Sequence, residues 1–401
     1  MNKKIVLITS SFPFGKSEVW AISEINSIVE LGNEILIIPR SGKGQITNQD
    51  AIKFSSNLID LPLLDWKILI YFLKSLSIKP FLILKLFIAN FEQSNSIIDF
   101  LKGVAVLPKS IFLSKLLKQS NIDHIHSLQT TSIAFMAFII SSIIEVPWSC
   151  TLHTSEIVNS NYRRSFKFRL NSASALRTIS RKTWKDLSNF LGPDSSEKIL
   201  MIPLGVNVND FKKKTNLNKN FFVIVTPAEL TNRKGHAYAI EAAKKMLDKG
   251  ITNFKWFFYG SGPLKDELMK KVKDLNLINH CFFPGNLDHD LLMKKYREDE
   301  VDIVVISSIS KNVPEGIPVS LMEAMSFEIP VIATDSGSTR ELVDGTSGIL
   351  VNQNDSEALS SAIVKFINKP KYMKEIGKNG RNKVSQDFDA MKNANDLVKI
   401  F

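Results

Sequence analysis

The chain has 401 residues, 44% of them hydrophobic, and a formal net charge of +11. This length predicts two domains of about 200 residues each. The charge is uneven, because residues 1–190 hold 22 basic and 13 acidic side chains. Such an excess suits a phosphorylated substrate, an anionic membrane or a nucleic acid. The sequence has no zinc-ligand spacing, basic heptad region or RNA-binding aromatic motif, so we exclude nucleic acid as a partner.

The cysteines and the first residues indicate the compartment. Cys150 and Cys281 are the two cysteines, and they lie far apart in apolar stretches. This predicts no disulfide framework and a reducing compartment. The apolar run at residues 5–8 is too short for a signal peptide and ends at a turn that contains Gly15. We therefore expect a cytoplasmic protein in which this run is the first strand.

The first half alternates short apolar strands with helical patterns, which is typical of a doubly wound α/β domain. The expected strands are 5–9, 34–39, 122–125, 148–153, 173–180 and 198–203, and the expected helices are 17–31, 132–144 and 181–191. A basic loop at 208–220 follows the last strand. We place the end of the first domain at residue 207.

Residues 58–91 are apolar but are interrupted by four lysines and by a helix-breaking proline, namely Lys67, Lys74, Lys79, Lys85 and Pro80. A membrane-spanning helix needs about 20 apolar residues with few charges, so we expect two short amphipathic helices instead. Apolar bulk with lysines suits peripheral contact with the inner face of a membrane. The alternative is that both helices pack on the first sheet and the lysines are solvated.

Three histidines lie at expected strand ends. His124 and His126 have a spacing that could ligate a metal, but no third ligand is placed nearby, so we interpret them as strand residues. His153 lies at the carboxyl end of the expected strand 148–153, where open α/β sheets bind ligands. The alternative for His153 is a hydrogen-bonded core residue.

The second half repeats the α/β pattern. The expected strands are 221–227, 254–259, 281–286, 301–306 and 330–334, and the expected helices are 236–249, 264–275, 319–327, 356–368 and 372–388. We place the second domain at 208–387 and a final helix at 388–401. Lys234 precedes the helix at 236–249, and a lysine beside a helix N-terminus is suited to binding phosphate.

The most informative stretch is the strand–loop–helix–strand unit at 301–343. Its loop ends at the N-terminus of a helix, where free backbone N–H groups bind phosphate. Glu315 lies just before this helix and Glu323 lies within it. A carboxylate is the usual partner of ribose hydroxyls. The alternative is a solvated helix with two unrelated glutamates.

Several motifs together resemble a known family. Glu315 and Glu323 with seven residues between them, Ala324-Met325, and the runs 330–334, 341–343 and 345–351 resemble the donor-site signature of retaining glycosyltransferases of family 4. Residues 11–32 resemble the first unit of bacterial capsule and exopolysaccharide glycosyltransferases. The resemblance implies the GT-B fold: two doubly wound Rossmann-like α/β domains facing each other across a cleft, with the last helix crossing back to the first domain.

The resemblance also implies a reaction. A hexosyl unit would pass from a nucleotide sugar, UDP- or GDP-linked, to an acceptor hydroxyl with retention of anomeric configuration. The acceptor would be a glycan or lipid-linked glycan in cell-surface polysaccharide synthesis. No cofactor and no metal are expected, because helix N-termini and Lys234 would stabilise the leaving diphosphate.

Roles follow from the same resemblance. Glu315 would contact the sugar hydroxyls and support an oxocarbenium-like centre, His153 would hydrogen-bond the donor sugar, and Lys234 would bind the diphosphate. The remaining donor-binding candidates are Gly15, Arg233, Gly262, Gly285, Gly316, Val319, Ser320, Leu321 and Glu323. Within this set, Glu323 would accept hydrogen bonds from the ribose hydroxyls of the nucleotide.

One departure and two rival functions remain open. Glu229 stands where the family has an arginine, and Arg233, which does not match the motif position, is the candidate for the missing cation. A first rival is a sister activity on the same fold, such as a phosphorylase or a sugar-nucleotide epimerase. A second is a non-catalytic GT-B binding subunit that partners an active glycosyltransferase.

Overall fold

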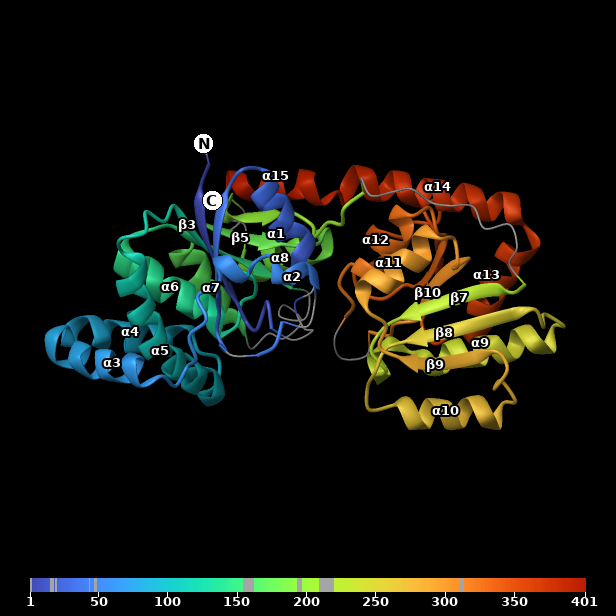
Figure 1. The fold of residues 1–401 in the computed structure, drawn as a ribbon, viewed down its shortest axis with the longest axis horizontal. Coiled ribbons are helices and arrows are strands. Elements are labelled where there is room, and N and C mark those ends of the chain that lie inside the picture. Colours follow the sequence, from blue (N-terminus) through green and yellow to red (C-terminus); the bar gives the residue numbers. More distant parts are fainter. Residues whose placement is uncertain are drawn as a thin grey trace. The chain divides into compact units, whose positions relative to one another are not determined.

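The computed structural model describes residues 2–14, 18, 20–42, 44–46, 49–153, 162–192, 197–208, 220–310 and 314–401. The chain forms two compact units (Figure 1). The first unit comprises Met1–Pro203 together with Ala390–Phe401, and the second comprises Leu204–Asp389. The chain therefore returns to the first unit for its last twelve residues.

The first unit is built on a six-stranded parallel sheet with the order β2-β1-β3-β4-β5-β6. The strands are β1 Lys4–Thr9, β2 Glu34–Pro39, β3 His124–Ser127, β4 Trp148–Leu152, β5 Ala175–Thr178 and β6 Ile199–Met201. Every residue of β3, β4 and β5 is buried. Helices cover both faces of this parallel sheet, so that even the polar residues of these central strands, such as His126 and Arg177, are buried.

The helices of the first unit are α1 Ala21–Glu30, α2 Gln49–Ile52, α3 Trp66–Ile78, α4 Pro80–Gln93, α5 Ile97–Leu117, α6 Ser132–Ile144, α7 Arg163–Ser172, α8 Arg181–Leu191 and α15 Ala390–Lys399. Helices α4 to α8 contribute to one apolar cluster, whereas α1 and α15 contribute to the cluster on the other face of the sheet. Pro80 is the first residue of α4, so two helices replace one long span, as predicted. Within the described residues, no helix is both long and apolar enough to cross a bilayer.

The second unit has a parallel sheet with the order β12-β11-β10-β7-β8-β9. Its strands are β7 Phe222–Pro227, β8 Phe254–Tyr259, β9 Cys281–Gly285, β10 Ile303–Ile306, β11 Val331–Thr334 and β12 Ile349–Val351. Its helices are α9 His236–Asp248, α10 Lys265–Asp274, α11 His289–Arg297, α12 Val319–Ser326, α13 Ser356–Asn368 and α14 Pro370–Asp387. Helices α9, α10 and α13 line one face, and α11, α12 and α14 line the other. Both units are doubly wound α/β, as predicted.

A buried lysine fixes the chain after β2. The ammonium group of Lys109 on α5 donates to the carbonyl oxygens of Pro39 (2.5 Å), Arg40 (3.0 Å) and Leu61 (2.5 Å). Burial lowers the pKa of Lys109 to about 8, although the charge of Asp60 offsets part of that effect. One cation therefore accounts for three backbone carbonyl groups, two at the end of β2 and one in the segment before α3.

We expect Lys109→Met to lower the free energy of unfolding by about 3 kcal/mol, because it leaves three buried carbonyl oxygens without this donor. Urea unfolding measures the difference. The control is Lys102→Met on the same helix, whose side chain is exposed and whose replacement should change stability by at most about 0.5 kcal/mol. Equal effects of the two substitutions would show that the Lys109 hydrogen bonds contribute nothing to stability.

Candidate active site

The site lies where the strand order of the second sheet reverses. Strands β7 and β10 are neighbours there, and their carboxyl ends lead to two turns that continue in opposite directions along the sheet. In open α/β sheets this switch point is the usual place for a ligand. The turn after β7 contains a 3-10 helix, Asn232–Lys234, and leads to α9, while the turn after β10 leads to α12.

A glycine lets these two turns approach each other. Gly235 has a φ of +62°, and a Cβ atom built on it would lie 2.0 Å from the carbonyl oxygen of Ser307. The Ser307 hydroxyl donates to the carbonyl oxygens of Lys234 and Gly235, each at 3.1 Å. The N–H of Ile309 donates to the carbonyl of Arg233 at 2.8 Å. No other residue type fits at position 235 without moving the backbone.

Glu315 is the centre of the site. Its Oε2 accepts from Lys234 Nζ at 2.8 Å, from Arg233 Nη1 at 3.1 Å and from the Ser308 hydroxyl at 2.8 Å. Burial alone would raise the pKa of Glu315, but the charges of Lys234 and Arg233 and the hydrogen bonds from Lys234 and Ser308 hold this pKa below its usual value. The carboxylate is therefore ionised at neutral pH.

A second glycine fixes the backbone of Glu315. Gly337, in the turn after β11, has a φ of +60°, and a Cβ there would lie 1.9 Å from the Glu315 carbonyl oxygen. The N–H of Ser338 donates to that oxygen at 3.0 Å. Three turns of the sheet, after β7, β10 and β11, therefore meet at one residue.

Helix α12 begins at the residue that the sequence predicts. Pro318 is the residue before the helix, and Val319 is the first helical residue. Gly316, Val319 and Ser320 are half-buried. The Leu321 side chain is fully buried and its N–H donates to the Pro318 carbonyl at 3.1 Å, so neither group is available to a ligand in this arrangement.

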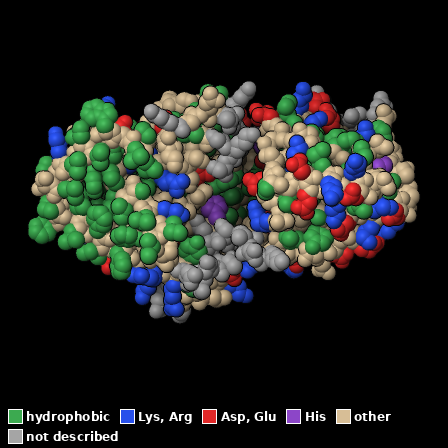
Figure 2. Space-filling view, turned by 90° about the horizontal axis from the view of Figure 1, so that it is seen from below, with side chains coloured by type: hydrophobic (Ala, Val, Ile, Leu, Met, Phe, Trp, Pro, Cys, Tyr) green, Lys and Arg blue, Asp and Glu red, His purple; other side chains and the backbone are tan. Residues whose placement is uncertain are grey.

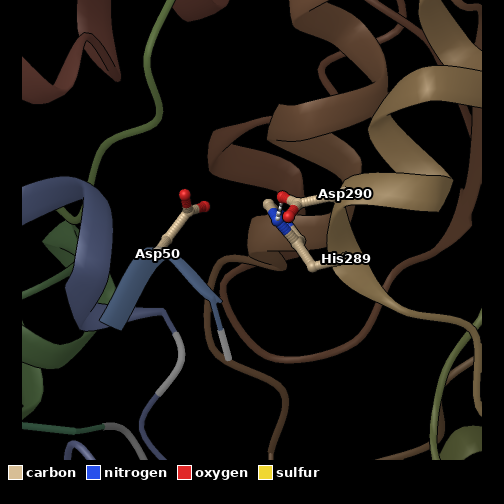
Figure 3. A group of neighbouring side chains, drawn as sticks. All are labelled: Asp50, His289 and Asp290. Atoms are coloured by element: carbon tan, nitrogen blue, oxygen red, sulfur yellow. Dashed lines mark ion pairs between the residues drawn. The ribbon is translucent and has the colours of Figure 1, made fainter. Parts of the chain in front are cut away.

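Glu323 has a partner that the sequence did not reveal. Its Oε1 lies 2.8 Å from Nε2 of His289, the first residue of α11. Figure 3 shows His289 beside Asp290, with the His289 Nδ1 3.9 Å from the Asp290 carboxylate. Asp288 caps this helix by accepting from the Asp290 N–H at 3.0 Å. An aspartate cap followed by a helical pattern was the available signal, but residues 289–297 were not predicted as a helix.

Gly262, after β8, and Gly285, the last residue of β9, have different surroundings. A Cβ at Gly262 would lie 2.4 Å from the Leu230 carbonyl oxygen, so this glycine lets the turn after β8 contact the turn after β7. Gly285 has a φ of +90° and nothing within 4 Å of its Cβ position. Its carbonyl accepts from the Gly260 N–H at 2.9 Å. Gly262 is thus required by packing, whereas the Cβ side of Gly285 is open.

Glu229, which stands in place of an arginine, has an exposed side chain. Its carbonyl oxygen lies 2.8 Å from Nε2 of His236. Burial lowers the pKa of His236 to about 4, so this imidazole is neutral and donates from Nε2. Residue 229 therefore contributes its backbone carbonyl group, and not its side chain, to the contacts of this turn. Arg233 is the second cation beside Glu315, in addition to Lys234.

His153 belongs to the first unit, directly after β4. Its Nε2 lies 3.0 Å from the Leu128 carbonyl oxygen, and its ring packs edge-on against Trp20 at 4.9 Å between centroids. The ring is half-buried at the carboxyl end of the sheet, as predicted. Gly15 lies outside the described residues.

The turn after β1 already contains an anion. The buried carboxylate of Glu18 accepts from the N–H groups of Ser10 (3.1 Å), Ser11 (2.8 Å) and Phe12 (2.9 Å). These three donors would otherwise form a concave site for phosphate. Sequence reasoning missed this role of Glu18.

A small polar cavity was also missed. Its volume is about 150 Å³, and it lies in the first unit between the segment after β3 and helices α5 and α7. Lys102, Asp99 and Arg169 contribute charged groups to its wall. The Arg169 guanidinium donates to the Ser165 hydroxyl and the Thr130 carbonyl, which fixes it in place.

We expect Glu315→Gln to lower the free energy of unfolding at pH 7 by about 2–3 kcal/mol, because Lys234 loses its buried partner and the contribution of the partly exposed Arg233 is screened. The pKa of Glu315 in the folded state lies below its usual value, so its contribution to stability is fully present above the unfolded-state pKa and is lost as the pH falls through the lowered value. Urea unfolding at neutral and acidic pH should show the difference between wild type and variant shrinking in acid.

The control for this substitution is Glu357→Gln, which removes surface ion pairs to Lys245 and Lys249. Its effect should stay small at every pH. A difference for Glu315→Gln that is the same at neutral and acidic pH would contradict the ionised, ion-paired state of Glu315.

Comparison with known proteins gives this geometry a family context. Residues 207–383 match the family model described as Glycosyl transferases group 1. WcaL of Salmonella typhimurium, to which a glycosyltransferase role in colanic acid biosynthesis is ascribed, is 32% identical over 199 residues, 48% of each chain. TuaC of Bacillus subtilis, ascribed to teichuronic acid biosynthesis, is 27% identical over 300 residues, 71% of this chain and 72% of that protein. The match thus spans about half the length of WcaL.

Solved structures resemble the chain over nearly its whole length. HepE from Anabaena in complex with UDP has a TM-score of 0.74 at 18% identity, covering 99% of this chain and 98% of that one. A glycosyltransferase from Rickettsia africae has a TM-score of 0.74 at 18% identity, covering 100% and 97%. At this identity the likeness concerns the fold alone. The chain has the GT-B fold, and its residues 207–383 are similar to the Glycosyl transferases group 1 family.

Proposed function

We propose that the chain is a retaining hexosyltransferase. It transfers a hexosyl unit from a UDP- or GDP-linked sugar to an acceptor hydroxyl of a glycan or lipid-linked glycan, in the synthesis of a cell-surface polysaccharide. The observation that carries the proposal is the cluster of Lys234, Arg233 and Ser308 around Glu315 at the switch point of the second sheet. The names of WcaL and TuaC and the complexes of HepE with UDP and UDP-glucose support the donor class and the pathway class.

Diphosphate binding follows from the charges of this cluster. Lys234 and Arg233 together carry two positive charges against the single negative charge of Glu315. The cluster therefore keeps one unit of positive charge for an incoming anion. When the bond between sugar and diphosphate breaks, negative charge grows on the phosphate oxygens, and cations fixed beforehand stabilise it without reorganising. Arg233 supplies the second positive charge, which Glu229 cannot supply.

The two glutamates have different tasks in this proposal. Glu315 is ionised and buried, so it contacts sugar hydroxyls and stabilises positive charge that develops at the anomeric carbon. Glu323 is held through Oε1 by His289, which orients its other oxygen toward the ribose hydroxyls. The nucleoside is thus bound by Glu323, and the reacting sugar by Glu315, with His153 of the first unit as a further hydrogen-bonding group for the sugar.

Calorimetric titration with UDP, GDP, ADP and their hexose conjugates, first without added metal and then with EDTA, tests the donor site. We expect one diphosphate to bind in both conditions, because side-chain cations serve the phosphates. Binding that EDTA abolishes would contradict the metal-independent site. Binding of none of the nucleotides would contradict the proposed function and favour the non-catalytic binding subunit.

We expect Lys234→Ala to lower turnover by about 100- to 1,000-fold, the usual effect of losing one donor to the leaving group. The release of nucleoside diphosphate from the donor identified by titration measures turnover. Lys244→Ala on α9, an exposed ion pair with Asp248, is the matched control and should leave turnover unchanged. Normal turnover of the Lys234→Ala variant would show that Lys234 does not stabilise the leaving diphosphate.

We expect Glu323→Ala to raise the Kd for the nucleotide by about 10- to 100-fold, because one charged hydrogen-bond acceptor is lost. Glu315→Ala should mainly lower turnover at saturating donor. Calorimetry and initial rates on the same preparations separate the two effects, with the melting temperature as a check on folding. Equal and small effects of both substitutions would refute this division of roles.

A further inference from the structure

Helices α3 and α4, the residues just before α3 and the first turn of α5 expose an unusual number of large apolar side chains. We call this set the apolar face: Leu64, Trp66, Leu69, Ile70, Leu73, Leu76, Ile78, Phe81, Leu84, Ile88, Phe91, Ile97, Ile98 and Leu101. Figure 2 shows hydrophobic side chains gathered over this part of the first unit. Monomeric proteins rarely expose so many contiguous large apolar side chains without a use for them.

The apolar face is a second stripe on helices that already have one. On α4, Ile83 and Leu86 are buried in the cluster under the first sheet. Phe81, Leu84 and Ile88 lie at helical spacing on the opposite side and remain exposed. A helix that only packs on a sheet needs one apolar stripe and a polar outer side. The outer stripe therefore indicates contact with a second apolar medium.

Basic residues outnumber acidic ones around the apolar face, and its acidic residues, Asp65, Glu92 and Asp99, lie toward its ends in the sequence. From Trp66 to Phe91 the chain has four lysines and no acidic residue, and Lys67, Lys74, Lys79 and Lys85 are all exposed. Helix α7 packs against α4 and adds exposed Arg163 and Arg164. The Arg164 guanidinium lies 5.2 Å from the centre of the Phe91 ring. Basic groups thus adjoin the apolar side chains.

We propose that the apolar face docks on an anionic lipid bilayer, with α3 and α4 lying in the plane of the interface. Apolar side chains enter the acyl region, and lysine and arginine side chains extend along them so that their charged ends reach lipid phosphates. A second copy of the chain is a poorer occupant, because it would bring the same lysines against each other. This inference does not depend on the proposed reaction.

Co-sedimentation of the full chain with vesicles tests the proposal. We expect binding to vesicles of phosphatidylcholine with phosphatidylglycerol, weaker binding to phosphatidylcholine alone, and a decrease with salt on the anionic vesicles. Tryptophan fluorescence should shift to shorter wavelength on binding, and Trp66→Phe should remove most of the shift, because Trp66 belongs to the apolar face. Failure of wild type to bind either vesicle would overturn the proposal.

Matched variants separate apolar from charged contributions. Leu73→Ser with Phe81→Ser, at side chains 55% and 86% exposed, should weaken binding to both vesicles by about tenfold or more. Ile278→Ser with Leu291→Ser, 59% and 51% exposed in the second unit, should not. Lys74→Gln with Lys85→Gln should weaken binding to anionic vesicles alone, by about fivefold per lysine.

Two outcomes would overturn the proposal even if wild type binds vesicles. One is undiminished binding of the Leu73→Ser, Phe81→Ser variant. The other is a wild-type dimer without lipid that this variant converts to a monomer, which would assign the apolar face to a second copy. Melting temperatures and nucleotide titration of each variant confirm that folding and the donor site are intact, so this test is independent of the donor-site tests.

Discussion

The second unit depends on one buried carboxylate. Glu315 accepts hydrogen bonds from Lys234, Arg233 and Ser308, and its carbonyl accepts from Ser338. These partners come from the turns after three different strands, so a single side chain sets the spacing of the switch point. Removing the charge of Glu315 would leave a buried ammonium without its partner, which is costlier than losing a surface ion pair. This arrangement requires glycine at positions 235 and 337, because a Cβ atom at either position would collide with the backbone of Ser307 or Glu315.

The chain holds a carboxylate at a turn in each unit, but the donors differ. Glu18 accepts from three backbone N–H groups that have fixed positions. Glu315 accepts from side chains, and side chains of lysine and arginine can rotate toward a new anion. The first arrangement therefore stabilises a turn, while the second could exchange partners with the diphosphate of the proposed donor. Charge alone does not distinguish these two sites; the mobility of the donors does.

Much of the fold could be predicted because buried parallel strands are continuous apolar runs, and Glu315 and Glu323 stood out within one such unit. The partners of these glutamates could not, since Lys234 and Glu315 are 81 residues apart and His289 lies in a helix that was not predicted. Helix α5 also escaped prediction, because Gly103 and Pro108 interrupt its pattern. Contacts that join distant turns depend on sheet order, which a local pattern does not encode.

The uneven charge of the sequence agrees with the different ligands proposed for the two units. The excess of basic residues lies in the part of the chain that carries the apolar face, whereas the anion site proposed for the second unit uses a few placed cations. A soluble nucleotide sugar needs fixed charges at one point, because its diphosphate must be held in register with the sugar. A lipid surface needs diffuse positive charge over an apolar area, because its phosphates move laterally. An acceptor that is lipid-linked would then reach the enzyme in the plane of the membrane, and the donor would reach it from solution.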